Sequence, residues 1–339
     1  MSHGKIILAH GSGGALTHNL IRDVFARHLH NPLLDAHDDA AVWRPCLEAG
    51  DRLALTTDSY VVQPIFFPGG DIGRLSVCGT VNDLAMVGAR PLYLSAAFIL
   101  EEGLALDDLD RIVSSMAQAA REAGVEVVAG DTKVVDYGSA DRIFITTAGT
   151  GVVPSGIEIS GSSARPGDGV LVSGAIGMHG LAILSKREGL SFSFPLASDC
   201  APLNGLVSAM LTADGRIHCL RDPTRGGLAT TLVEIAQQSQ VGIDLEEERI
   251  PIPGSVQAAC ELLGLDPLYV ANEGKLVAIV APEAEAGLLT AMRQHGLGRE
   301  TALVGRVTSD HPSRVVMRTR LGTRRMLDML SGAQLPRIC

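Results

Sequence analysis

Residues 75–89 constrain the fold most, because they are long enough for a helix and largely apolar around its whole circumference. Such a helix has no face suited to water, so other elements must cover it. Asp83 carries its only charge, and Asn82 stands beside it. A carboxylate on a buried helix calls for a cation or a specific hydrogen-bond donor. The alternative for Asp83 is a helix cap or a solvent-facing position.

Strand and helix patterns alternate on both sides of this stretch. Apolar residues at helical spacing predict an amphipathic helix that ends near His28. A second helix is expected over residues 109–123, with acids at its N-terminal end that suit the helix dipole. Apolar runs predict strands at residues 53–62, 93–99, 125–134 and 143–153, and a short strand just after Asp39. This order indicates an α+β or α/β sheet with helices on one face.

A turn signal at residues 165–169 precedes a second series of elements. Residues 174–177 open a helix, and further helices are expected near 201–213, 224–238, 255–263 and 283–295. Strands are expected near 170–173, 241–245, 275–281, 301–307 and 314–319. We predict a glycine-rich segment with a helix (1–40), a first domain (41–155), a second, α/β domain (160–327) and a mobile tail (328–339).

The formal net charge of −10 argues against nucleic acid as a partner and suits a protein that collects divalent cations. No segment approaches the roughly 20 unbroken apolar residues that cross a bilayer, so no membrane partner is expected. The opening residues lack the pattern of a signal peptide, which favours a cytoplasmic location. Six scattered cysteines without a CxxC pair argue against a zinc site or a disulfide framework.

Acidic residues of the first half stand at or inside apolar segments. Spread evenly, they would be surface residues, but at strand and helix ends they can line one cleft. Mg²⁺ takes oxygen ligands, typically a few carboxylates together with water and phosphate oxygens. Several carboxylates can therefore hold two or more Mg²⁺ ions on a nucleoside triphosphate. The candidates are Asp38, Asp39, Asp58, Asp83 and Asp131.

Phosphate contacts require other groups. The sequence contains neither a Walker A pattern nor a protein-kinase signature. The glycine-rich loop at residues 11–14 lies just before a helix N-terminus, which favours phosphate binding, and Lys133 is a second candidate. In the loop at residues 221–227, Thr224 is expected to cap a helix and is preceded by Asp222. That loop faces an anion or a metal, or is simply a capped turn.

The last residue, Cys339, is a lone thiol after a segment with little reason to be rigid. Chain termini are usually mobile. Fully extended, the chain from Leu327 to Cys339 reaches about 40 Å. A thiol there suits a group carried between sites better than a nucleophile that needs a fixed base. The alternative is a terminal cysteine without a role.

Several segments, in this order, resemble the ATP-binding superfamily that contains aminoimidazole ribonucleotide synthetase, the PurM-like proteins. They lie at residues 38–42, 57–59, 81–91, 130–133 and 222–227. Within the superfamily, the opening at residues 10–14 and the ending at residues 336–339 resemble one family, the HypE carbamoyl dehydratases of NiFe-hydrogenase maturation. The similarity extends from residue 5 to the end of the sequence.

This resemblance implies a two-domain PurM-like fold in which the N-terminal sheet joins its counterpart in a homodimer. ATP lies near that interface in the first domain, and the C-terminal α/β domain packs behind it. The implied Mg²⁺ ligands are Asp38, Asp39, Asp58, Asp83 and Asp131. The other residues implied to bind the nucleotide are Gly11, Gly13, Gly14, Thr57, Asn82, Gly130 and Asp222.

The resemblance also implies a reaction. Cys339 receives a carbamoyl group from the carbamoyltransferase HypF, and ATP drives loss of water to give a thiocyanate. The cyano group then passes to iron on a HypC–HypD scaffold. Phosphorylation of the thiocarbamate oxygen makes phosphate the leaving group, and positioning and Mg²⁺ charge supply most of the stabilisation.

Loss of the amide protons needs a base near the site that the tail visits. Lys133 and Glu273 are the candidates for phosphate stabilisation and proton removal, and their two roles can be exchanged. The alternative for Glu273 is a surface acid paired with Lys275.

Two other functions remain as alternatives. Selenophosphate synthetases share the core motifs, but they place a reactive cysteine or selenocysteine near the N-terminus, and no cysteine precedes Cys46 here. A non-catalytic carrier whose terminal cysteine is modified by other proteins would have no use for the acids and Lys133.

Overall fold

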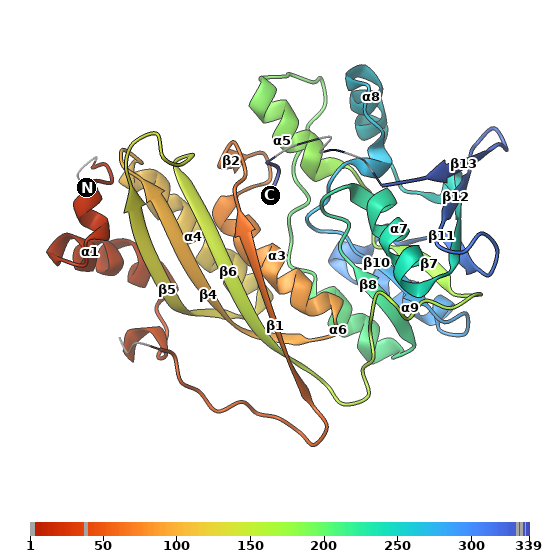
Figure 1. Cartoon of the computed structure of the whole chain (residues 1–339), viewed down its shortest axis with the longest axis horizontal. Helices are drawn as coiled ribbons and strands as arrows, with labels where there is room; N and C mark the ends of the chain where they lie inside the picture. The colour runs from red at the N-terminus through yellow and green to blue at the C-terminus, as the bar shows by residue number, and fades with distance from the viewer. Residues whose placement is uncertain (1–3, 37–39, 330–331, 333–334, 336) are drawn as a thin grey trace.

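The computed structural model describes residues 4–36, 40–329, 332, 335 and 337–339. Its first domain contains a four-stranded sheet of β1 (Arg52–Tyr60), β4 (Arg90–Glu101), β5 (Glu126–Val135) and β6 (Ile143–Val153). The strands pair in the order β1-β6-β4-β5, antiparallel except for the parallel pair of β4 and β5. The helices α3 (Ile72–Met86) and α4 (Leu106–Ala123) cover one face (Figure 1), as predicted.

α3 is buried along nearly its whole length, as its sequence requires. Its N-terminal cap is Asp71, whose carboxylate accepts hydrogen bonds from the main-chain nitrogens of Gly73 (2.8 Å) and Arg74 (3.0 Å). A Cβ on Gly73 would lie 2.2 Å from the carbonyl oxygen of Ile112 on α4, so glycine permits the close packing of the two helices. The helix ends before Gly88, whose φ of +73° turns the chain.

The N-terminal helix is assembled from α1 (Ala15–Leu20), a π-helical turn (Ile21–Ala26) and α2 (Arg27–Leu29), and it follows a 3₁₀ turn (Leu8–Gly11). The short strand expected after Asp39 is wrong, because residues 41–48 form no strand. Pro45 has no N–H to donate to a sheet. Trp43 instead packs against Tyr93 of β4, with 5.0 Å between ring centroids.

The second domain is built on a seven-stranded sheet in the order β13-β12-β9-β11-β7-β10-β8. Its strands are β7 (Gly169–Val172), β8 (Ile217–Arg221), β9 (Gly242–Glu246), β10 (Val277–Val280), β11 (Ala302–Thr308), β12 (Val315–Arg318) and β13 (Arg324–Leu327). Its helices are α5 (Met178–Glu188), α6 (Asn204–Ala213), α7 (Gly227–Ser239), α8 (Gly254–Leu263) and α9 (Glu285–Gln294).

The sheet of the second domain is covered on both faces. Residues of α7 pack with Val170, Ile243 and Val277 on one face, whereas residues of α6 and α9 pack with Leu171 and Ala278 on the other. The central strands β7 and β10 are therefore continuous apolar runs, as the sequence showed. No strand was expected at β8 or β13, because each is short and carries arginine. A two-residue hairpin of β2 (Phe66–Phe67) and β3 (Gly70–Asp71) was also not expected.

α3 joins the cores of the two domains. Ala85 and Met86, at its C-terminal end, pack among the buried side chains of α6 and α9. Between these apolar contacts, Asn82 is 1% exposed and bonds three main-chain groups of the second domain. Its side-chain nitrogen donates to the carbonyl oxygens of Ala201 (3.2 Å) and Glu273 (3.3 Å), and its oxygen accepts from the nitrogen of Leu203 (2.7 Å).

No helix among the described residues combines the length and the apolar character that a membrane crossing needs.

Replacing Asn82 with alanine should lower the free energy of unfolding by about 3 kcal/mol, because three buried main-chain groups lose their partner. Asn204→Ala is the matched control, since Asn204 is half-buried and makes one bond between the domains, to the carbonyl oxygen of Ala123 (2.7 Å). We expect a loss of about 1 kcal/mol for the control. Chemical denaturation followed by circular dichroism compares the two, and equal losses would contradict the role given to Asn82.

Candidate functional site

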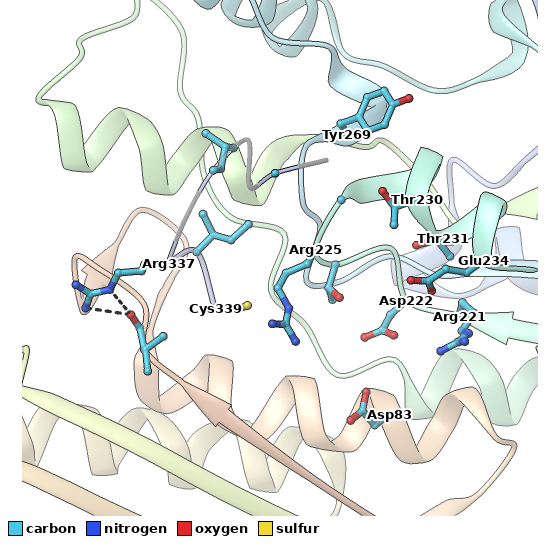
Figure 2. Close-up of a pocket in the computed structure, with 16 residues that line it drawn as sticks. Asp83, Arg221, Asp222, Arg225, Thr230, Thr231, Glu234, Tyr269, Arg337 and Cys339 are labelled. Carbon is cyan, nitrogen blue, oxygen red and sulfur yellow. Dashed lines mark hydrogen bonds between the residues drawn. The ribbon is translucent and has the colours of Figure 1, made fainter. Parts of the chain in front are cut away.

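A cavity of about 760 Å³ opens between the two domains, beside the C-terminal end of the chain (Figure 2). The first domain contributes Val61, after β1, and Asp83 of α3. The second domain and the tail contribute Arg221, Asp222, Thr224, Arg225, Gly226, Thr230, Thr231, Glu234, Tyr269, Gly332, Leu335, Arg337, Ile338 and Cys339. The cavity is therefore walled by segments far apart in the sequence.

The loop between β8 and α7 forms one wall. α7 begins at Gly227 and its N-cap is Gly226, so the expectation that Thr224 caps the helix is wrong. Gly227 and Gly226 have φ angles of +61° and +78°, in the left-handed region that glycine adopts readily, so the chain turns sharply where the helix begins. A Cβ at Gly227 would also lie 2.6 Å from the carbonyl oxygen of Leu268. The turn leaves Arg225 at the cavity wall (Figure 2).

Carboxylates converge on this cavity from both domains. Asp83 accepts a hydrogen bond from the hydroxyl of Thr56 (2.9 Å), and its pKa is raised, mainly by burial and also by the charge of Asp58. The pKa of Asp222 rises to about 7, through burial and then the charge of Asp83. Burial, followed by the charge of Asp222, also raises the pKa of Glu273. Each carboxylate thus disfavours ionisation of its neighbours, so the cavity suits a bound cation.

Glu273 is 3% exposed, so the surface-acid alternative is wrong. Lys275 forms its ion pair with Asp199 instead, at 3.4 Å. Asp199 also accepts a hydrogen bond from the main-chain nitrogen of Glu273 (3.1 Å) and so fixes the loop that carries it.

The end of the tail is docked against the first domain and α5. The carbonyls of Arg337 and Cys339 accept hydrogen bonds from the main-chain nitrogens of Gln63 (3.2 Å) and Val61 (3.1 Å), the pattern of an antiparallel strand pair. Ile338 lies between them and is 5% exposed. Arg337 adds an ion pair with Asp141.

Two side chains of α5 hold the same segment. The Nε2 atom of the buried His179 donates to the carbonyl oxygen of Ile338 (2.7 Å), and its Nδ1 atom lies 2.7 Å from the hydroxyl of Ser198. Arg187 donates to the carbonyl oxygen of Arg337 (2.7 Å). Neither residue was a candidate from the sequence, because a side chain that binds a main-chain carbonyl leaves no recognisable pattern.

Docking places the sulfur of Cys339 at the cavity, where Figure 2 shows it facing Arg225. Burial, followed by the charge of Glu273, raises the pKa of the thiol to about 12, against the opposing effect of Arg225. A thiolate is the nucleophilic form of cysteine, so the docked thiol is a poor nucleophile. This arrangement suits a residue that carries a substrate into the cavity.

Other predicted residues lie at the opposite edge of the first sheet. Lys133 and Asp131 form an ion pair on β5, with 2.8 Å between Nζ and Oδ1, and their side chains are 65% and 61% exposed. β5 and β1 are separated by two strands, so the pair does not reach Asp58 within one chain. The glycine-rich loop packs at the same edge, where a Cβ on Gly11 would lie 2.7 Å from the nitrogen of Val134.

The predicted residues therefore fall into two groups in one chain. Asp83, Asp222 and Cys339 line the cavity, and Asp58 and Glu273 lie close enough for their charges to act on Cys339. The second group, near β5, contains Gly11, Gly13, Gly14, Gly130, Asp131 and Lys133. Thr57 bonds the carbonyl oxygen of Thr147 (3.1 Å), Asn82 is engaged between the domains, and Asp38 and Asp39 lie outside the described residues.

No group of three histidine, cysteine, aspartate or glutamate side chains in the described ranges is arranged to hold a metal ion. The carboxylates nevertheless match what Mg²⁺ prefers, because that ion commonly takes only one or two protein carboxylates and completes its shell with water and phosphate oxygens.

Comparison with known proteins covers both domains. Residues 37–153 match the model of the AIR synthase related protein N-terminal domain, and residues 165–318 match that of its C-terminal domain. The carbamoyl dehydratase HypE of Azotobacter vinelandii is 58% identical over 339 residues, which cover 100% of this chain and 98% of the relative.

Two solved structures are similar over nearly the whole chain. The crystal structure of hydrogenase maturation protein HypE in complex with ATP has a TM-score of 0.94 at 52% identity, covering 98% of this chain and 99% of that one. A chain of the HypE–HypF complex has a TM-score of 0.80 at 50% identity, covering 94% of this chain and 100% of that one. The chain belongs to the HypE family of carbamoyl dehydratases, within the AIR synthase related proteins.

Proposed function

We propose that this chain is an ATP-dependent carbamoyl dehydratase whose substrate is its own Cys339 in S-carbamoylated form. The observation that carries the proposal is the docked tail, which places the Cys339 sulfur at a cavity lined by carboxylates of its own chain. The 58% identity to a relative named carbamoyl dehydratase supports the reaction, and the similar HypE structure that contains ATP supports the nucleotide. A carrier without catalysis would need no such cavity.

The proposed reaction has two steps. The carbamoyl oxygen on Cys339 forms a bond to the γ-phosphorus of ATP while ADP leaves with the electron pair of the broken bond, and one amide proton is removed. The C–O bond of this phosphorylated intermediate then breaks toward phosphate, and the remaining N–H proton leaves with it. The products are a thiocyanate on Cys339, ADP, phosphate and one proton. Phosphate is the better leaving group, which is why ATP is required.

ATP and Mg²⁺ are the proposed requirements of the site. Asp58, Asp83 and Asp222 are the residues that would hold Mg²⁺ on the phosphates, because Asp83 and Asp222 line the cavity and the charge of Asp58 acts on both. The ion would supply positive charge to the triphosphate. Asp38 and Asp39 remain sequence predictions as further ligands.

Glu273 is the proposed base. It is buried close enough to Cys339 for its charge to raise the pKa of that thiol. Its raised pKa gives its carboxylate a higher affinity for the amide proton. Lys133 lies at the far edge of the sheet, away from Cys339, so we assign it to the stabilisation of phosphate and not to proton removal.

A homodimer is the proposed assembly, because it accounts for the second group of predicted residues. The face of the first sheet opposite α3 exposes Leu53 (65%), Leu55 (76%) and Ile99 (42%). A second copy on this face would bury these side chains. Its Asp131 and Lys133 would then approach the nucleotide held by the first copy.

The donor of the carbamoyl group is proposed to be HypF, supported by the similar chain in a HypE–HypF complex. Transfer of the cyano group to a HypC–HypD scaffold and a cytoplasmic location are proposals that rest on the sequence resemblance. Because such partners are other proteins, the tail must leave the cavity to meet them and return for dehydration.

Cys339→Ala should acquire no carbamoyl group when incubated with HypF, carbamoyl phosphate and ATP. The wild-type protein should gain one carbamoyl group and then lose one water, as followed by intact-mass spectrometry. Cys46→Ala is the matched control, because Cys46 is an exposed free thiol far from the tail in sequence, and it should behave as wild type. Modification of the Cys339→Ala protein would refute the role of the tail.

Asp83→Asn should reduce ATP turnover by the carbamoylated protein at least about 100-fold, because the site loses a charge that holds Mg²⁺. The control is Asp214→Asn, which removes a carboxylate paired with Arg216 outside the cavity. Phosphate release, measured at saturating Mg²⁺, should be normal for the control. Unchanged turnover in Asp83→Asn would place the metal site elsewhere.

Alkylation should report the docking of the tail. At about pH 8, iodoacetamide should modify the exposed Cys46 at least about tenfold faster than Cys339, because docking raises the pKa of the Cys339 thiol and so keeps it un-ionised. Docking raises the pKa of Cys339 to about 12, because the docked position favours the neutral thiol. The stabilisation that this neutral thiol gives to the docked tail is complete below about pH 8.5 and declines as the pH rises toward 12.

Arg337→Ala removes the ion pair with Asp141 and should accelerate alkylation of Cys339 without affecting Cys46. Peptide mass mapping at several time points gives both rates in one sample. Equal rates for the two thiols in the wild-type protein would show that the tail is not docked.

A further inference from the structure

Arg225 is a cation that the proposed reaction has not yet used. Its side chain is exposed at the cavity wall and forms no hydrogen bond or ion pair within the part of the chain that the structure describes. Figure 2 shows its guanidinium between the sulfur of Cys339 and the carboxylate of Asp222. Arg221, by contrast, lies beyond Asp222 and donates to the side-chain oxygen of Gln238 (3.4 Å).

In the proposed reaction, Arg225 lies between the donor and the acceptor of the phosphoryl group. A nucleotide held on the Asp83 side of the cavity donates this group, and the carbamoyl oxygen on Cys339 receives it. Asp58 and Glu273 also act on Cys339, and like Asp83 and Asp222 they repel a phosphate. A guanidinium matches phosphate oxygens in geometry and keeps its charge, so it offsets this repulsion at the acceptor end.

Two further groups of the same cavity wall are candidate donors. The N-cap of α7, Gly226, has no side chain to bond the first main-chain nitrogens of the helix, which therefore favour an anion. The hydroxyl of Thr230 is buried at the cavity and has no hydrogen-bond partner among the described residues. That hydroxyl lies directly against Gly226, since a Cβ there would be 2.3 Å from it.

We propose that Arg225, Thr230 and the N-terminal end of α7 form the site that binds the phosphoryl group during its transfer to the carbamoyl oxygen and its departure as phosphate. The inference rests on the proposed function and assigns it a further catalytic residue. Arg225 contacts the equatorial oxygens while the new P–O bond forms. It then holds the phosphate to which the electron pair of the breaking C–O bond passes.

The first test is a single turnover of full-length protein carbamoylated on Cys339, followed by intact mass. Arg225→Ala should dehydrate at least about 100-fold more slowly, the loss typical of one deleted oxyanion donor. The KM for ATP should change less than about threefold, since the nucleotide is held from the Asp83 side. Arg225→Lys should recover part of the rate, because it restores the charge without the paired donors.

The matched control is Arg216→Ala, whose arginine lies in the same domain and pairs with Asp214 away from the cavity. It should dehydrate at the wild-type rate. A wild-type rate for Arg225→Ala would overturn the proposal and leave the dehydratase function intact. A parallel loss in kcat and rise in the KM for ATP would also overturn it, because Arg225 would then bind the nucleotide.

A second measurement does not depend on dehydration. Isothermal titration of the unmodified protein with inorganic phosphate should show at least tenfold weaker binding in Arg225→Ala, and weaker binding in Thr230→Val, than in wild type or Arg216→Ala. Phosphate titration tests the phosphate site independently of dehydration. Failure of the wild-type protein to dehydrate would refute the proposed function and not the phosphate site. Equal phosphate affinity in all four proteins would overturn the site.

Discussion

The structure depends on the burial of α3 from both sides. One helix supplies apolar side chains to the core of the first domain and, through Ala85 and Met86, to that of the second. A helix with no exposed face cannot separate from either domain without exposing apolar area to water. The two polar residues at its centre therefore lie at a fixed boundary. Asn82 bonds the second domain across it, and Asp83 faces the cavity that the boundary creates.

The boundary between the domains brings buried carboxylates close together. Burial and the charges of neighbouring carboxylates raise the pKa values of Asp83, Asp222 and Glu273, and Arg221 offsets only part of this effect for Asp83 and Asp222. A site organised only for stability would pair such groups, as Asp199 is paired with Lys275. Cations that arrive with the substrate would relieve the repulsion, so a metal–nucleotide complex would gain binding energy at this cavity.

The sequence predicted the buried helix and the alternation of strands and helices, because hydrophobic periodicity is a local property. The lone charge of Asp83 predicted a polar position on this buried helix, and Asp83 lies at the cavity wall. Strand order is not local, however, and it places β1 and β5 at opposite edges, so Asp131 and Lys133 do not join Asp58 in one chain. The docking of the tail was also not predictable, because it uses main-chain nitrogens at residues 61 and 63 and the buried side chain of His179.

The docked tail also determines the kinetic order of the reaction. Its terminal residues pair with the backbone of the same chain, so the reacting group arrives by an intramolecular step. Its effective concentration at the cavity is set by the tether and does not fall when the protein is diluted. In the proposed reaction the thiocyanate would stay covalently attached to Cys339 until a partner takes it, so it would not be lost by diffusion. Each molecule would then complete one turnover per loading.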